Sequence, residues 1–208
     1  AIVVFNPMKE RALERFASPQ DPVEMATGAS TPIASRYFQS AVGGDHWVVR
    51  GIAKALLAAD APESPTIDHA FIAEHTAGIE AFRADVGAHD WAEIEAGSGL
   101  TRAELEEAAT IYARSKAVIL CYGMGITQHR SASSTVQQLM NLLLLGGHIG
   151  RPGAGICPLR GHSNVQGART VGLAEKPSAA MLDSLERVFG VPMPRRHGHT
   201  VVEAIEAL

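Results

Sequence analysis

The sequence predicts an α/β protein with a Rossmann-like, mostly parallel sheet and flanking helices. Two apolar runs, AIVVF at residues 1–5 and AVILCYG at 117–123, have the composition of buried parallel strands. Each run ends in a turn and is followed by residues of helical character. Because ligands of open α/β sheets bind at the carboxyl ends of the strands, the turns after these two runs are the expected ligand sites.

The elements of the first half are predicted with different clarity. Residues 8–16 have helical composition over a short stretch, and residues 17–43, rich in Pro, Ser, Thr and Gly, are expected to be irregular. Apolar residues at helical spacing predict a helix within 43–60, with Asp45 as its N-cap. Two prolines in residues 61–67 then break the regular structure.

The second half begins with helices. Residues 67–86 predict one helix or a pair of helices. Residues 99–116 form the clearest helix of the sequence, in which Thr101 and Glu104 are spaced as a capping box. A further helix over 131–147 is expected to stop at its two terminal glycines.

A long glycine-rich stretch follows. Residues 148–172 contain six glycines and are predicted to form a functional loop. Helices are expected again within 178–194 and 199–208. We expect two domains: an α/β domain over 1–160 and the beginning of a neighbouring α/β domain over 161–208.

Composition and charge argue against several classes of function. The chain has 208 residues, of which 46% are hydrophobic and 19% are charged, and its formal net charge is -4. Without a basic excess, nucleic acid is not an expected partner. The apolar stretches are too short for a membrane span and the first residues do not have the pattern of a secretory signal, so a cytoplasmic protein is expected. Cys121 and Cys157 are expected to stay reduced rather than pair.

The first residues also predict how the chain relates to a larger protein. The sequence opens inside an apolar strand, with no initiator Met ahead of it. We therefore expect a piece cut from a longer polypeptide. An edge left unpaired on the first strand is then expected to promote dimerisation or to expose apolar surface.

The turn YGMGITQ after the second strand has two interpretations. Gly123 and Gly125 let the backbone approach a ligand closely, and the amides that follow can face an anion. Gln128 adds an amide donor and acceptor. The alternative is a tight strand-to-helix turn around a buried Met124.

Asp45, in the segment GGD, also has two interpretations. Its carboxylate can simply cap the following helix. Alternatively, it can accept two hydrogen bonds from a guanidine-like edge such as that of a guanine base.

The stretch PLRGHSNVQG is the most informative part of the sequence. Arg160 stands beside Gly161, so its fork of donors is accessible to a carboxylate or a pyrophosphate. Asn164 and Gln166 carry donors and acceptors that can read the edge of a heterocycle, and His162 can change protonation near neutral pH. The alternative is that these side chains satisfy backbone groups of their own loop.

Other common motifs are missing from the sequence. It contains no G-x-G-x-x-G fingerprint, no P-loop, no H-E-x-x-H and no G-x-S-x-G elbow. A nicotinamide- or nucleotide-binding module is therefore a weaker alternative. His46, His69, His75 and His89 are expected at the surface on polar helix faces, and no metal site is expected.

Two longer segments, GMGITQH and NLLLLGGHIGRPGAGICPLRGHSNVQGA, closely resemble the molybdopterin oxidoreductase family, particularly catalytic subunits of the formate dehydrogenase type. The resemblance runs over most of the chain, is most specific over 118–172 and is weak over 173–208. FNPMKERALERF and GGDHWVVRGIAKAL look most like a branch distinct from the well-known formate dehydrogenases. The implied fold is part of the molybdopterin-binding domain of the formate dehydrogenase and DMSO reductase type.

This resemblance implies a bis(molybdopterin guanine dinucleotide) cofactor carrying molybdenum or tungsten. By analogy, Asn6 and Asp45 lie near the guanosine end of one dinucleotide, and the GMG-x-x-Q turn lines the pterin side. The implied cofactor-binding residues are Asn6, Asp45, Gly123, Met124, Gly125, Gln128, Gly161, Asn164, Gln166 and Gly167.

The resemblance also implies two catalytic residues. Arg160 takes the place of the arginine beside the metal, where it would hold a small anionic substrate such as formate. His162 would orient or move a proton, but formate dehydrogenases of this type usually carry Gln at its position. Arg169 and Thr170 also replace the small and acidic residues that are common there.

These departures keep a divergent enzyme with another substrate open as an alternative. A non-catalytic nucleotide-binding or scaffold domain is the alternative from another class.

The remaining parts of such an enzyme are expected outside this chain. Neither cysteine matches a metal-ligand position of the family. The residue that ligates the metal and any 4Fe-4S cluster are therefore expected in the remainder of the polypeptide, and electron-transfer subunits are expected partners. The chain by itself is expected to be inactive.

Overall fold

A computed structural model describes residues 1–174 and 176–208. The chain divides into two compact units, Ala1–Leu159 and Arg160–Leu208. The first unit contains the described strands and most of the helices, and the second is helical.

Parallel strand pairs lie at two places in the first unit. Strand β1 (Val3–Phe5) pairs with β4 (Arg36–Phe38), and β5 (Ile119–Tyr122) pairs with β6 (Gly155–Pro158). A short antiparallel pair joins β2 (Arg15–Phe16) to β3 (Thr31–Pro32). The two predicted strands are confirmed and both pair in parallel. The described residues form three two-stranded sheets, however, rather than the one mostly parallel sheet that we predicted.

Two segments predicted to be irregular contain regular structure. Residues 17–43 include the helix α2 (Pro22–Thr27) and the strand β4, and residues 148–172 include β6 and the helix α10 (Val165–Thr170). Strands of three or four residues are too short to show a period in the sequence. They form here because their backbone groups hydrogen-bond to β1 and β5.

Helices are the main regular structure of the first unit. The predictions over 43–60, 67–86, 99–116 and 131–147 are confirmed, the second of them as a pair of helices. The bounds are α1 (Arg11–Glu14), α3 (Asp45–Ala59), α4 (His69–His75), α5 (Ile79–Gly87), α6 (Trp91–Ser98), α7 (Arg102–Ala113), α8 (Met124–Thr127) and α9 (Ala132–Leu145).

Helix α7 begins at the predicted capping box. The Thr101 hydroxyl accepts a hydrogen bond from the Glu104 backbone N–H at 3.3 Å, and a Glu104 carboxylate oxygen accepts one from the Thr101 N–H at 2.9 Å. Two of the N–H groups that a helix leaves unpaired at its start are thereby satisfied.

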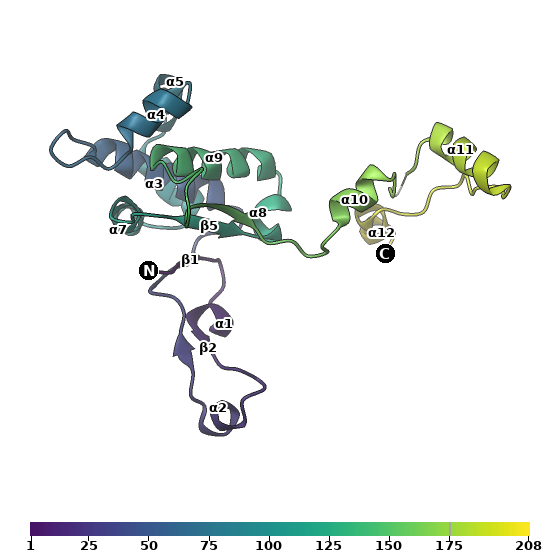
Figure 1. Cartoon of the computed structure of the whole chain (residues 1–208), viewed down its shortest axis with the longest axis horizontal. Helices are drawn as coiled ribbons and strands as arrows, with labels where there is room; N and C mark the ends of the chain where they lie inside the picture. The colour runs from purple at the N-terminus through teal and green to yellow at the C-terminus, as the bar shows by residue number, and fades with distance from the viewer. Residues whose placement is uncertain (175) are drawn as a thin grey trace. The chain divides into compact units, whose positions relative to one another are not determined.

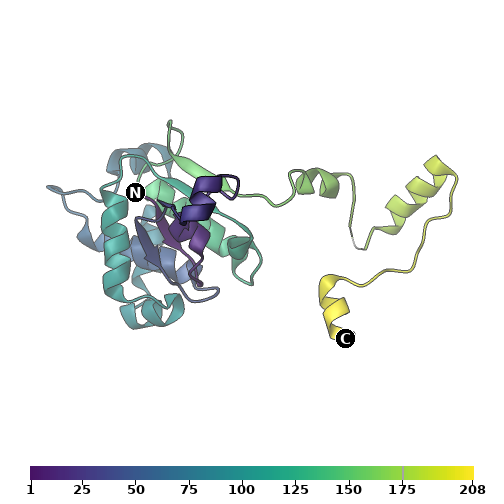
Figure 2. The same cartoon turned by 90° about the horizontal axis from the view of Figure 1, so that it is seen from below.

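The core of this unit lies around α3. This helix packs against α6, α7 and α9, and Figure 1 shows α3 and α9 side by side. Its apolar face is buried with residues of the helices around it, and the stacked rings of Phe5 and Phe38 bring β1 and β4 against the same core. Figure 2 shows the strands flanked by helices when this unit is viewed from below. The core therefore fixes the start of α3, where Asp45 lies.

The second unit contains α10, α11 (Ala179–Phe189) and α12 (Val201–Glu206). Helices were predicted over 178–194 and 199–208, and both are confirmed. Ser178 caps α11 through the Met181 backbone N–H, and Gly190 ends it in the left-handed conformation. Across the described ranges, no helix is both long and apolar enough to cross a membrane.

Candidate cofactor-binding site

The turn after β1 is held by Asn6. Its side-chain amide nitrogen donates to the Met8 carbonyl at 2.8 Å, to the Glu10 carboxylate at 2.7 Å and to the Tyr37 hydroxyl at 3.2 Å. The backbone N–H of Asn6 continues the parallel pairing by donating to the Phe38 carbonyl. Asn6 therefore shapes the turn at the carboxyl ends of β1 and β4, and its amide donors are already engaged.

Two glycines position Asp45 at the start of α3. Gly43 has a φ of +74°, a conformation that favours glycine. A Cβ on Gly44 would lie 2.7 Å from the Gly97 carbonyl oxygen and 3.2 Å from that of Ser98, so only glycine fits against the end of α6. Gly44 is the N-cap residue and Asp45 is the first residue of the helix.

The prediction that Asp45 is the N-cap is therefore wrong by one residue. Its side chain makes no hydrogen bond or ion pair with another of the described residues. Burial raises the pKa of its half-buried carboxyl group, opposed by its own backbone N–H and by the charge of nearby His129. This carboxylate is thus partly desolvated and, among the described residues, accepts only from its own backbone N–H, so it retains capacity to accept from a ligand.

A polar cluster surrounds the start of α3. His46 Nδ1 lies 3.2 Å from the Ser134 hydroxyl of α9, and His46 Nε2 lies 3.2 Å from the Arg50 guanidinium. Arg50 is almost fully buried and pairs with the Asp85 carboxylate at 3.0 Å. Burial, followed by the charge of Arg50, lowers the pKa of His46. The cluster joins α3 to α9 and holds His46 in the neutral form at neutral pH.

The prediction that His46, His69, His75 and His89 lie at the surface is only partly correct. His69 and His75 are exposed, whereas His46 and His89 are half-buried. His89 packs edge-on against Trp47 and contacts the Glu93 carboxylate at 2.8 Å. These two histidines lie where helices pack against α3, and their burial depends on tertiary contacts.

The segment after β5 contains two glycines that internal packing does not explain. Gly123 has a φ of -124°, which any residue can adopt. A Cβ at Gly123 would meet only the Leu159 carbonyl, at 3.9 Å, and a Cβ at Gly125 would meet nothing within 4 Å. The side chains of Met124 and Gln128 are exposed and make no hydrogen bonds with the described residues. The turn presents bare backbone to its surroundings.

The alternative interpretation is correct about the tight strand-to-helix turn, which leads from β5 into α8, but wrong about Met124, which is exposed. His129 directly follows this turn, and its Nε2 atom is buried without a hydrogen-bond partner among the described residues. Its charge acts on both Asp45 and His46. The structure thus brings the segment after β5 close to the start of α3.

The stretch 160–167 belongs to the second unit. Arg160, His162 and Gln166 are exposed, and their side chains form no hydrogen bond or ion pair within the described ranges. Asn164 instead caps α10, because its side-chain oxygen accepts from the Gly167 backbone N–H at 3.1 Å. A Cβ on Gly167 would lie 2.2 Å from that oxygen, so Gly167 and Asn164 serve the helix itself. Gly161 faces open space.

Sequence reasoning missed His46, Ser134 and His129. The signal for His129 was its place immediately after GMGITQ. Nothing in the sequence indicated His46 and Ser134, because their contact is made only when α9 packs beside α3. Within residues 1–174 and 176–208, no group of three or more His, Cys, Asp or Glu side chains is arranged to hold a metal ion.

Comparison with known proteins points to one class of relative, the oxidoreductases. An alignment of 209 residues that covers the whole chain shows 39% identity to an uncharacterized oxidoreductase of Mycobacterium tuberculosis. Formate dehydrogenase H of Escherichia coli is 38% identical over 110 residues, which cover 53% of this chain and 15% of that protein. No family model matches the chain.

Higher identity is found with a particular protein. Over its whole length the chain is 47% identical, across 212 residues, to Protein YdeP of Escherichia coli. It spans 28% of the length of YdeP and 27% of the mycobacterial oxidoreductase. The similarity therefore relates this chain to one part of larger proteins.

Proposed function

We propose that this chain is part of a molybdopterin-dependent oxidoreductase and binds part of a bis(molybdopterin guanine dinucleotide) cofactor. The observation that carries the proposal is the pair Gly123 and Gly125. Neither backbone conformation nor internal packing requires glycine at these positions. Close approach of a bound group to the backbone gives them a reason. Similarity to oxidoreductases over the whole chain, and to formate dehydrogenase H over half of it, supports this cofactor class.

The residues of the first unit fit the proposed group. Asp45 offers a half-buried carboxylate that, among the described residues, accepts only from its own backbone N–H. A guanine base presents N1–H and N2–H groups side by side, and these can donate to the two oxygens of one carboxylate. The open backbone of 123–125 offers amide groups and space for the pterin side. Asn6, whose donors are engaged, would support the turn rather than bind through its amide nitrogen.

The second unit would supply the substrate-binding groups. Arg160 has an accessible guanidinium with no partner among the described residues, which suits a small anion such as formate. His162 would orient or move a proton beside it. The bound cofactor supplies the two-electron redox chemistry. The protein contributes binding, orientation and charge.

Guanine recognition by Asp45 can be measured without the full cofactor. Titration calorimetry with guanosine diphosphate and with adenosine diphosphate should show a preference for the guanine nucleotide. Hydrogen bonds to a charged acceptor contribute about 1.5–3 kcal/mol, so Asp45→Asn should weaken guanosine diphosphate binding by about 10- to 100-fold. Adenosine diphosphate binding should be unchanged.

A matched control removes an exposed carboxylate elsewhere. Glu80→Gln on α5 deletes one negative charge far along the chain from the glycine-bearing turns and should leave the guanine preference intact. Equal binding of the two nucleotides, or equal loss in both variants, would refute the role of Asp45. A protein that binds neither nucleotide nor molybdopterin guanine dinucleotide would instead be the non-catalytic scaffold.

A further inference from the structure

The two cysteines of the sequence lie directly opposite each other. In the parallel pair β5–β6, the register places Cys121 against Cys157. Composition alone predicts that the two thiols stay reduced, but this register places them opposite each other, and we propose that they form a reversible disulfide, which makes the β5–β6 pair a redox-responsive link. The proposal rests on strand register and exposure alone and is independent of the proposed cofactor.

Strand geometry brings both thiols to the same face. Side chains alternate between the two faces of a strand. Leu120, Tyr122 and Ile156 pack against the core, so Cys121 and Cys157 occupy the opposite face. Paired strands lie about 4.8 Å apart, which is within the Cα separation of about 4.4–6.8 Å that a disulfide spans.

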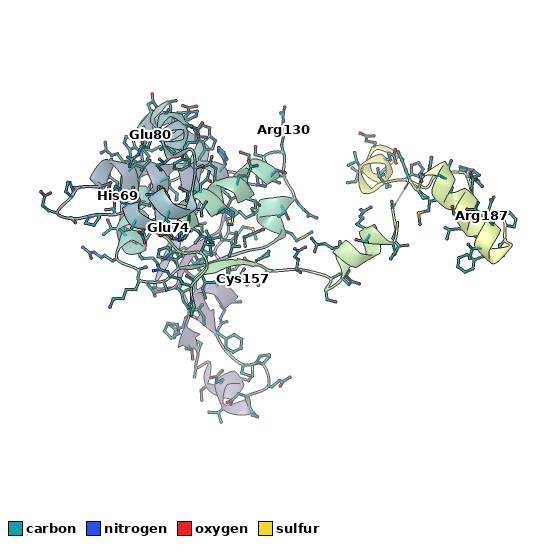
Figure 3. The ribbon with its side chains drawn as sticks, turned by 45° about the horizontal axis from the view of Figure 1, so that its top comes forward. His69, Glu74, Glu80, Arg130, Cys157 and Arg187 are labelled. Atoms are coloured by element: carbon teal, nitrogen blue, oxygen red, sulfur yellow. The ribbon has the colours of Figure 1, made fainter. Side chains whose placement is uncertain are left out.

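These thiols are also accessible. Both are free, with Cys121 exposed and Cys157 half-buried, and Figure 3 labels Cys157 on β6. On the same face, Ile119 is 58% exposed, so the described residues leave this side of β5 largely uncovered. The sequence contains two cysteines in all, so every thiol reaction of the chain concerns this pair.

Thiol–disulfide exchange provides a balanced route to the bond. A thiolate of the pair attacks a small-molecule disulfide such as oxidised glutathione, forms a mixed disulfide and releases one glutathione thiolate. The second protein thiolate attacks the protein sulfur of that mixed disulfide, forms the Cys121–Cys157 bond and releases the second glutathione. Two protein thiols are oxidised, one glutathione disulfide is reduced, and the two thiol protons end on the released glutathiones.

Two properties follow from the surroundings. Burial and the neighbouring Cys157 thiol raise the pKa of Cys121, so its exchange should accelerate as the solution becomes more alkaline. The exposure of Cys121 also leaves the bond accessible to reductants. Exposed disulfides are the readily reduced, regulatory kind.

The test counts thiols and measures mass on the purified chain. Reduced protein should show two thiols per chain with a chromogenic thiol reagent. After oxidised glutathione it should show none, its mass should fall by two hydrogen atoms with no glutathione retained, and size-exclusion chromatography should show no covalent dimer. Peptide mapping should find Cys121 joined to Cys157, and excess reduced glutathione should restore both thiols.

A register-shifted variant is the matched control. Ile119→Cys combined with Cys121→Ser keeps two thiols on the same exposed face, but moves one of them opposite Gly155. Its Cα would lie about 8 Å from that of Cys157, beyond disulfide reach. This variant should retain glutathione on its thiols. If the wild-type chain also retains glutathione, crosslinks between chains or keeps two free thiols, the proposal is wrong. Circular dichroism should show the same fold in both proteins.

Discussion

Replacing Gly51 by alanine tests the close packing of α3 against α7. In an open helix this change stabilises by about 1 kcal/mol, because alanine is the better helix former. Here the added methyl group would lie 2.7 Å from Leu105 Cδ1 and 3.0 Å from Ile94 Cγ2. Ordinary carbon contacts are about 3.5–4.0 Å. Leu105 and Ile94 are both fully buried, so neither can move into solvent to make room.

The magnitudes decide the sign of the effect. Overpacking of a core costs about 1–3 kcal/mol, which equals or exceeds the gain in helix propensity. We expect Gly51→Ala to lower the free energy of unfolding by up to about 2 kcal/mol. Leu105→Ala alone should cost about 2–5 kcal/mol through the cavity it leaves. In the double variant the new methyl group enters that cavity, so the two costs should not add, with a coupling of about 1–2 kcal/mol.

Urea unfolding followed by circular dichroism on the wild type, both single variants and the double variant gives the coupling. Gly87→Ala is the control, because a Cβ at this last residue of α5 would meet nothing within 4 Å. It should be neutral or slightly stabilising. A stabilising Gly51→Ala, or additive effects in the double variant, would refute the packing argument.

Two further predictions concern pH and capping. Burial lowers the pKa of His148, with Arg151 adding to the effect, and burial also lowers that of His46. The contribution of these two histidines to stability should be complete above about pH 6.5 and decline as the pH falls below it, because the unfolded chain then takes up protons that the folded chain does not. The urea concentration at the midpoint of unfolding should fall as the pH decreases through this range. It should fall less in His148→Asn, whose amide oxygen can still accept from Arg151. Equal dependence of the midpoint on pH in the wild type and this variant would contradict the prediction. Thr101→Ala should cost about 1 kcal/mol by removing the capping box with Glu104, whereas Thr101→Ser should retain most of the stability, and equal melting curves would show that the cap contributes nothing.

Local sequence predicted those elements whose determinants are local. Helix α7 was predicted because Thr101 and Glu104 specify its first turn and apolar residues follow at helical spacing. Strands β4 and β6 were missed because RYF and GICP show no period by themselves. Their partners lie far away in the chain, so only the folded structure gives these segments their hydrogen bonds.

The features of the candidate site also divide into those that the local sequence predicts and those that depend on tertiary contacts. The motifs around Gly123 and Arg160 were recognisable from residue type alone. The cap at the start of α3 was misplaced because the close approach of Gly44 to the Gly97 carbonyl, a tertiary contact, decides where the helix begins. Burial of His46 likewise depends on α9 lying beside α3, and no spacing within the α3 sequence encodes it.

The parallel pairing of the strands also bears on the order in which the chain folds. Val3 pairs with Arg36 and Ile119 pairs with Gly155, so each pairing closes a loop of more than thirty residues. Closing such a loop costs conformational entropy before the strand contacts can form. Helices α3 to α7 are instead joined by short connections and can associate early. We expect hydrogen exchange during refolding to protect the α3–α7 core first and β1 and β5 later. The turns at Asn6 and Gly123 would then be completed late, on a helical core that already exists.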